Sequence, residues 1–179
     1  MSICAAVCDP TNDSVVIATD SLAVWGDFHK DLGPKFIEYY AYGVTVAYAG
    51  STRFAQIAER LMRDNKYFRT AFNMRTIKRL ATDLQKATKE EGQEALGDSQ
   101  LLLVCKGHKR IHEIDTDFAV HKHKRWASIG SGGTFCEVVL EALFDLNVDI
   151  TVKERLMSAM KSVCAHHTEC GGKIHIREV

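Results

Sequence analysis

Three residues near the start of the chain have side chains that can do nucleophilic chemistry together: Ser2, Asp20 and Lys35. If Met1 is removed, Ser2 carries a hydroxyl and a free α-amine on the same residue. An unperturbed α-amine has a pKa of about 7.7–8.0, close to what a general base needs near neutral pH. The pattern therefore predicts a nucleophilic site at the N-terminus, with a carboxylate and a lysine nearby.

Each of these residues also has an ordinary explanation. A serine at position 2 is common and permits removal of the initiator methionine. Asp20 ends an apolar run, as strand-end turn residues do, and Lys35 can be a solvated side chain. The two interpretations differ in whether the strands and loops around these residues bring the three side chains together.

The first fifty residues predict two pairs of strands. The first pair is joined by the turn-forming sequence 9–13, and both of its strands are nearly continuously apolar, so we expect both faces to be covered. Residues 26–34 are predicted to form a loop. The predicted strands are residues 3–8, 14–19, 35–40 and 44–48.

Helices and strands alternate in blocks through the rest of the chain. Apolar residues at helical spacing predict helices over 52–64 and 73–91, and a third helix directly after Gly130–Gly133. Thr151 and Glu154 form a capping-box pattern that opens a fourth helix. Further strands are predicted at residues 101–105, 110–115, 126–129 and 173–179.

This order predicts one domain over residues 1–179 of class α+β. Periodicity alone indicates helices in pairs beside antiparallel strands. Strand pairs that are apolar on both sides need helices above and below. A four-layer αββα sandwich satisfies that requirement.

Composition excludes several classes of function. The chain has 23 basic and 23 acidic residues, so no long-range charge favours nucleic acid or an anionic membrane as a partner. No window approaches the ~18 apolar residues of a membrane-spanning helix. We also expect no secretion leader and a cytoplasmic location.

The six cysteines predict buried free thiols rather than disulfides, because most lie in apolar runs of a chain long enough to fold without crosslinks. Cys164, His166, His167 and Cys170 suggest zinc, but their spacing does not match a structural zinc site. Gly130–Gly133 precedes a helix, yet it lacks the lysine of a P-loop. We therefore expect a tight turn there and neither cofactor nor metal. Residues 121–125 are expected to form a solvated edge or loop.

Six segments in order resemble the proteasome β-type subunits among the N-terminal-nucleophile hydrolases, and most of all the bacterial HslV group. They are residues 2–8, 15–20, Lys35 before an apolar strand, 48–52, 129–133 and 171–176. Each segment alone is weakly specific, whereas six in sequence with compatible spacing are fairly specific. The resemblance implies the αββα fold and peptide-bond hydrolysis.

The resemblance also implies roles for individual residues. Ser2 stands where the family has threonine, and its Oγ would attack a carbonyl while its amine, through a water or directly, handles the proton. Lys35 would stabilise the nearby alkoxide, and Asp20 would hold Lys35. Gly50 resembles the oxyanion donor, an interaction of about 2.7–4 kcal/mol. Ser131 resembles the serine of the proton and water network.

Two positions depart from the family pattern. His167 stands at the family's late aspartate, and Cys170 at its serine. Either His167 takes over support of the Ser2 amine, or the site is silent. The alternatives are therefore a silent structural subunit and a small-molecule amide hydrolase of the same fold.

The binding partners of the chain are predicted from the family resemblance, and a subunit contact is predicted from the third helix. The resemblance implies a peptide or unfolded-protein substrate, a homo-oligomeric ring and an ATPase unfoldase. Apolar residues cover most of the circumference of the third helix, which predicts that it is buried on more than one side in a subunit contact. They are Phe135, Cys136, Val138, Val139, Leu140, Leu143 and Phe144.

Overall fold

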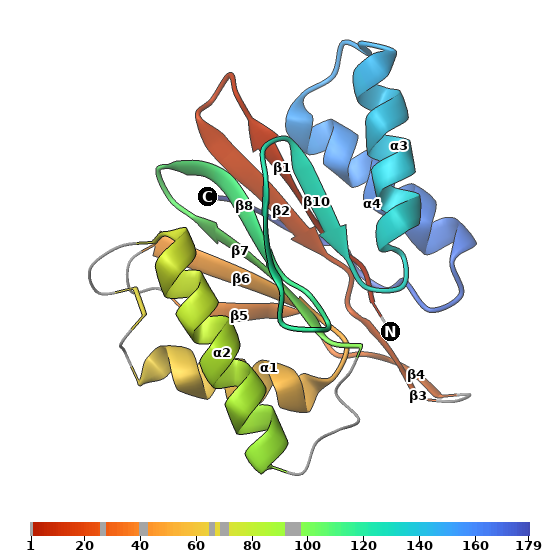
Figure 1. The fold of residues 1–179 in the computed structure, drawn as a ribbon. Helices are drawn as coiled ribbons and strands as arrows, with labels where there is room; N and C mark the ends of the chain where they lie inside the picture. The colour runs from red at the N-terminus through yellow and green to blue at the C-terminus, as the bar shows by residue number, and fades with distance from the viewer. Residues whose placement is uncertain (1, 26–27, 40–42, 65–66, 69–71, 92–97) are drawn as a thin grey trace.

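The computed structural model describes residues 2–25, 28–39, 43–64, 67–68, 72–91 and 98–179 (Figure 1). Met1 lies outside this range, so its removal stays a prediction. Tyr40, the last residue of the strand predicted over 35–40, also lies outside the described residues, so the predicted end of that strand is not tested.

Two antiparallel sheets form the centre of the molecule. The four-stranded sheet has the order β10-β1-β2-β11, and the five-stranded sheet has the order β5-β6-β7-β8-β9. The first contains β10 (Trp126–Ile129), β1 (Cys4–Asp9), β2 (Ser14–Thr19) and β11 (His175–Glu178). The second contains β5 (Phe36–Tyr39), β6 (Val44–Ala49), β7 (Gln100–Cys105), β8 (His108–Ile114) and β9 (Val120–His123).

Helices cover the outer face of each sheet (Figure 1). α1 (Thr52–Arg63) and α2 (Met74–Glu90) share a core with the five-stranded sheet, and α3 (Gly133–Asp145) and α4 (Val152–His166) with the four-stranded sheet. A third core fills the space between the two sheets. The predicted four-layer αββα sandwich is confirmed.

The strand β1 shows why its sequence is continuously apolar. Ile3 and Ala5 pack toward α3 and α4, whereas Cys4 and Ala6 pack against the other sheet. Alternate side chains of a strand point to opposite faces, so a strand between two layers has no solvated side. The register that pairs Cys4 with Thr19 brings the end of β2 to the start of the chain.

The loop predicted at residues 26–34 is wrong in part. β3 (Leu22–Trp25) and β4 (Phe28–Asp31) pair as a two-stranded antiparallel hairpin, with Leu22 opposite Asp31. The sequence between them is Gly26–Asp27, a dipeptide typical of two-residue hairpin turns. β4 was not predicted because its residues are mostly polar. A hairpin outside the two main sheets does not need an apolar face on this strand.

Several smaller predictions can be compared with the structure. Thr151 caps α4 and forms the predicted capping box with Glu154. The last strand begins at His175 instead of Lys173, and part of the 121–125 segment is the edge strand β9. Within the described ranges, none of the helices has both the length and the apolar character needed to cross a membrane.

Candidate active site

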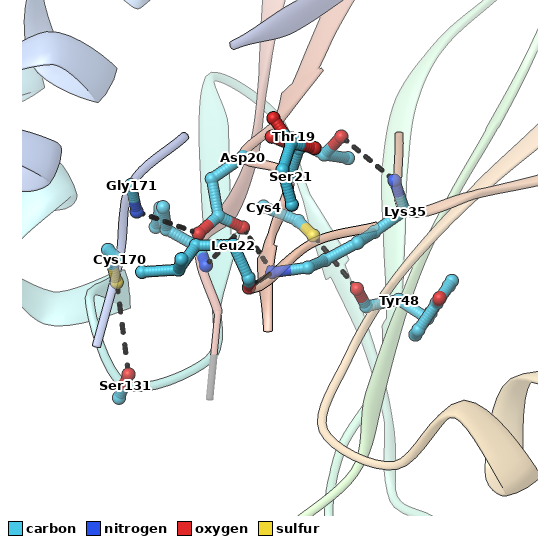
Figure 2. A network of polar contacts seen from close by, with 12 residues as sticks. Cys4, Thr19, Asp20, Ser21, Leu22, Lys35, Tyr48, Ser131, Cys170 and Gly171 are labelled. Atoms are coloured by element: carbon cyan, nitrogen blue, oxygen red, sulfur yellow. Dashed lines mark hydrogen bonds and ion pairs between the residues drawn. The ribbon is translucent and has the colours of Figure 1, made fainter. Parts of the chain in front are cut away.

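A buried ion pair lies where β2 ends and β5 begins. Lys35 Nζ is 2.5 Å from Asp20 Oδ1, and Lys35 and Asp20 are only 4% and 0% exposed (Figure 2). The Lys35 amine also donates to the carbonyl oxygen of Leu22 at 2.5 Å. The Lys35 backbone N–H donates to Thr19 Oγ1 at 3.2 Å, which ties the two strand ends together. Close hydrogen bonds of this kind offset the cost of burying two charges.

Asp20 also joins segments that are far apart in the sequence. Its Oδ1 accepts from the backbone N–H of Ile3 at 3.3 Å, and its Oδ2 accepts from that of Gly171 at 3.0 Å. Burial raises the pKa of Asp20, while the Lys35 ammonium and these two amides oppose the rise. Asp20 therefore fixes the peptide that follows Ser2 as well as the lysine.

Ser2, Lys35 and Gly50 line one cavity of about 200 Å³. Ser2 itself is almost fully buried. Gly130 adopts a positive φ of 88°, and a side chain at this position would collide with the carbonyl oxygen of Ser2. The remaining lining residues are Ala23, Val24, Leu32, Tyr48, Ser51 and Thr52.

Gly50 connects β6 to the start of α1. Its φ is +99°, and a Cβ there would lie 2.5 Å from Ser99 Oγ, so both the backbone and the space require glycine. Ser51 then caps α1, accepting from the backbone N–H of Arg53 at 3.1 Å. The cavity thus adjoins the N-terminus of a twelve-residue helix, where backbone dipoles favour negative charge.

A second cavity of about 340 Å³ shares Leu32, Tyr48 and Thr52 with the first. Its other lining residues are Phe36, Ile37, Ala55, Gln56 and Glu59. This lining combines apolar side chains with the polar side chains of Thr52, Gln56 and Glu59.

Ser131 and Cys170 lie on another side of the site, on two loops (Figure 2). Ser131 Oγ and Cys170 Sγ are 3.9 Å apart, which is a weak contact. Burial raises the pKa of Cys170 to about 12, so its thiol is neutral at physiological pH. Neither residue belongs to the described lining of the Ser2 cavity.

His167 ends α4 and takes part in a turn. Its Nδ1 accepts from the backbone N–H of Glu169 at 3.3 Å, and its carbonyl oxygen accepts from that of Cys170 at 3.1 Å. It is not among the described residues that line the Ser2 cavity. The structure therefore brings Ser2, Lys35 and Gly50 around one cavity, and Asp20 forms an ion pair with Lys35. His167 lies outside the described lining, in the turn that follows α4.

Sequence reasoning missed three backbone groups and one side-chain hydroxyl of this site. The amides of Ile3 and Gly171, the carbonyl of Leu22 and the hydroxyl of Thr19 all hold the Asp20–Lys35 pair. The sequence offered one indirect signal, the glycine pair at 171–172, which belongs to one of the six segments that carry the family resemblance.

The cysteines and acidic residues that the structure describes form no evident metal centre. All six cysteines lie in the described part of the chain, and none forms a disulfide. Among the described residues, no group of three or more His, Cys, Asp or Glu side chains is placed to hold a metal ion.

Comparisons with known proteins point to one family. The family model for proteasome subunits matches residues 5–178. A search of curated protein sequences gave no match.

Solved structures with the same fold cover nearly the whole chain. Eukaryotic HslV from Trypanosoma brucei is 22% identical over 98% of both chains, with a TM-score of 0.76. BPH from Thiobacillus denitrificans, in complex with epoxomicin, is 13% identical over 98% of this chain and 97% of that chain, with a TM-score of 0.73. Anbu from Yersinia bercovieri is 14% identical over 98% and 80%, with a TM-score of 0.75. At these identities the likeness shows a shared fold.

Proposed function

Because the chain belongs to the proteasome subunit family, we propose that it is an N-terminal-nucleophile peptidase whose nucleophile is Ser2 after removal of Met1. One observation carries the proposal. Ser2, Lys35 and Gly50 line a single cavity, and Lys35 is held there by the buried carboxylate of Asp20.

Ser2 supplies both the nucleophile and the base in this mechanism. Its Oγ forms a bond to the carbonyl carbon of a peptide, and the hydroxyl proton passes to its own α-amine. The negative oxygen that develops lies beside Gly50 and the N-terminus of α1. When the tetrahedral species collapses, the C–N bond breaks and the leaving amine takes the proton. Water then hydrolyses the ester and frees Ser2.

Lys35 stabilises the charge that develops on Ser2 Oγ. Its ammonium is nearly excluded from water, and electrostatic attraction is stronger there than in bulk solvent. The contacts with Asp20 and Leu22 fix its position, so little reorganisation is needed during the reaction. Asp20 is a holding group, because both of its oxygens already accept hydrogen bonds.

The direct test is hydrolysis of a panel of fluorogenic peptides. We expect slow turnover by mass-verified protein that begins at Ser2, and essentially none by Ser2→Ala or by protein that retains Met1. With Met1 attached, the Ser2 nitrogen is an amide without basicity. Equal rates in the Ser2-terminal protein and Ser2→Ala would place the activity elsewhere.

The same proposal includes assembly into a homo-oligomeric ring. Large apolar side chains on and just after α3 are exposed in the single chain, including Phe135 at 44%, Val138 at 59% and Leu146 at 75%. Exposed apolar groups that follow one helix face are typical of protein contacts. A ring would enclose the site and admit peptides or unfolded chains, supplied by an ATPase unfoldase in the cytoplasm.

Sedimentation of the wild-type chain and of Val138→Lys tests the assembly. We expect a ring-sized species for the wild type and smaller species for the variant. Lys161→Glu on α4 is a control that changes an exposed charge without touching the apolar face. A monomer at micromolar wild-type concentration contradicts the proposal.

A catalytically silent subunit is the second candidate function. The observation that favours it is the environment of His167, which stands at the family's aspartate and whose Nδ1 already accepts from Glu169. Absence of turnover in an intact ring of Ser2-terminal protein, with an unfoldase present, would support this alternative.

A further inference from the structure

The five residues that follow α4 form a turn that ends on Asp20. His167 leaves the helix with φ −108° and ψ 116°, after its N–H makes the last helical bond to Val163 at 2.8 Å. The N–H of Cys170 donates back to the His167 carbonyl, which closes a four-residue turn. The next residue is Gly171, whose N–H donates to Asp20 Oδ2 at 3.0 Å.

The imidazole of His167 adds a side-chain hydrogen bond to the same turn. Its Nδ1 accepts from the N–H of Glu169, two residues later. Asparagine and aspartate make this contact at the first position of many turns, because their side-chain oxygens reach the backbone N–H two residues on. His167 performs the same task with a ring nitrogen, which requires Nδ1 to carry no proton.

Gly171, the residue directly after the turn, is hydrogen-bonded on both sides to residues 20–22. The Gly171 N–H binds Asp20, and its carbonyl oxygen accepts from the N–H groups of Ser21 and Leu22 at 3.2 and 3.1 Å. The carbonyl of Leu22 in turn accepts from the Lys35 amine. A shift of Gly171 therefore reaches both partners of the buried ion pair (Figure 2).

We propose that His167 is a positioning residue, which holds the 167–170 turn through Nδ1 so that the Gly171 N–H stays on Asp20 and the Lys35 amine stays in the cavity. The proposal rests on the proposed function for its kinetic consequence alone. It assigns His167 a route through the backbone to Asp20 instead of direct support of the Ser2 amine.

The test compares three variants in the assembled protein. His167→Ala removes the acceptor, His167→Asn supplies a side-chain oxygen in its place, and His166→Ala changes the neighbouring exposed histidine as a control. We expect the Gly171 amide to exchange with solvent about fivefold faster in His167→Ala, the effect of losing one ordinary hydrogen bond. His167→Asn should restore the exchange rate, and His166→Ala should leave it unchanged.

Two further readouts separate positioning from general loosening. The Gly171 amide lowers the pKa of Asp20, so a carbon-13 titration of that carboxyl should show a higher pKa in His167→Ala and recovery in His167→Asn. In Ser2-terminal protein, kcat should fall about threefold to tenfold in His167→Ala with KM within twofold, and recover in His167→Asn.

The outcomes distinguish the two proposals. Unchanged Gly171 exchange and an unchanged Asp20 pKa in His167→Ala would overturn the role of His167, whether or not the protein is active. An inactive wild type with both shifts present would overturn the peptidase and leave the positioning role supported. Failure of His167→Asn to restore either readout would also count against the proposed acceptor role.

Discussion

Two sides of the site differ in how firmly they are held. On one side, Lys35 and Asp20 make contacts of 2.5 to 3.3 Å with each other and with backbone groups from three parts of the chain. On the other side, Ser131 and Cys170 meet through one sulfur contact of 3.9 Å. Charged hydrogen bonds in a buried place are strong, whereas a thiol is a weak donor and acceptor. We infer that the first side is indispensable and that the second tolerates change.

Removing Lys35 should produce the largest effect. Lys35→Ala leaves the Asp20 carboxylate buried without its partner, and breaking such a pair destabilises a protein by roughly 3–5 kcal/mol. Loss of the cation beside Ser2 should also lower kcat/KM by about 10²–10³. Denaturant unfolding and peptide hydrolysis measure the two effects.

Lys30→Ala is the matched control, because Lys30 is an exposed lysine on β4, five positions before Lys35 in the sequence. It should change neither quantity appreciably. Equal losses in the two variants would mean that the buried pair has no special role.

Replacing Asp20 by asparagine should have a smaller effect on stability. Asn keeps one acceptor, but its amide group presents a donor to the Lys35 ammonium or to the Gly171 amide, which costs about 1–3 kcal/mol. The variant also changes the pH dependence. Because burial raises the pKa of Asp20 in the folded state, its contribution to stability is complete below the unfolded value of 3.8 and declines as pH rises through the folded value.

Asp20→Asn has no such decline. Relative to the variant, the free energy of unfolding of the wild type should therefore fall as pH rises from about 3, so the wild type gains less stability between acid and neutral pH than Asp20→Asn. Identical slopes would contradict the raised pKa.

Changing Cys170 should have the smallest effect. Cys170→Ser places the family's residue beside Ser131, and we expect activity within about threefold and a free energy of unfolding within about 1 kcal/mol of the wild type. Alkylation followed by peptide mass mapping gives a second check. The Cys170 thiol is buried and its pKa is raised to about 12, so it should stay unlabelled at pH 8 in the folded protein and react after unfolding. A hundredfold loss of activity in Cys170→Ser would show that the two sides of the site are equally demanding.

The sequence predicts the fold better than it predicts the contacts of the site. Continuous apolar runs located β1 and β2, and the capping box located the start of α4, because burial and caps depend on residue type. The residue pattern suggested that Asp20 and Lys35 lie near Ser2, and the family resemblance assigned Asp20 to hold Lys35. Nothing in residue type alone brings two strand ends together.

The groups that hold the pair were hidden for a physical reason. The Gly171 amide and the Leu22 carbonyl are backbone atoms, which every residue has, so no composition or spacing marks them. Gly171 also lies 151 positions from Asp20 in sequence. The turn contact of His167 was hidden as well, because histidine is not among the residues that usually make it.

The most direct test of the central claim is covalent capture of Ser2. Epoxomicin, which is bound in the BPH structure with the same fold, is incubated with protein that begins at Ser2, with protein made while methionine aminopeptidase is inhibited, and with Ser2→Ala. Intact mass and peptide mapping then locate any adduct. We expect an adduct on Ser2 in the first sample and none in the other two. An adduct of equal extent in all three samples, or none in the first while the fold and assembly are intact, would contradict it.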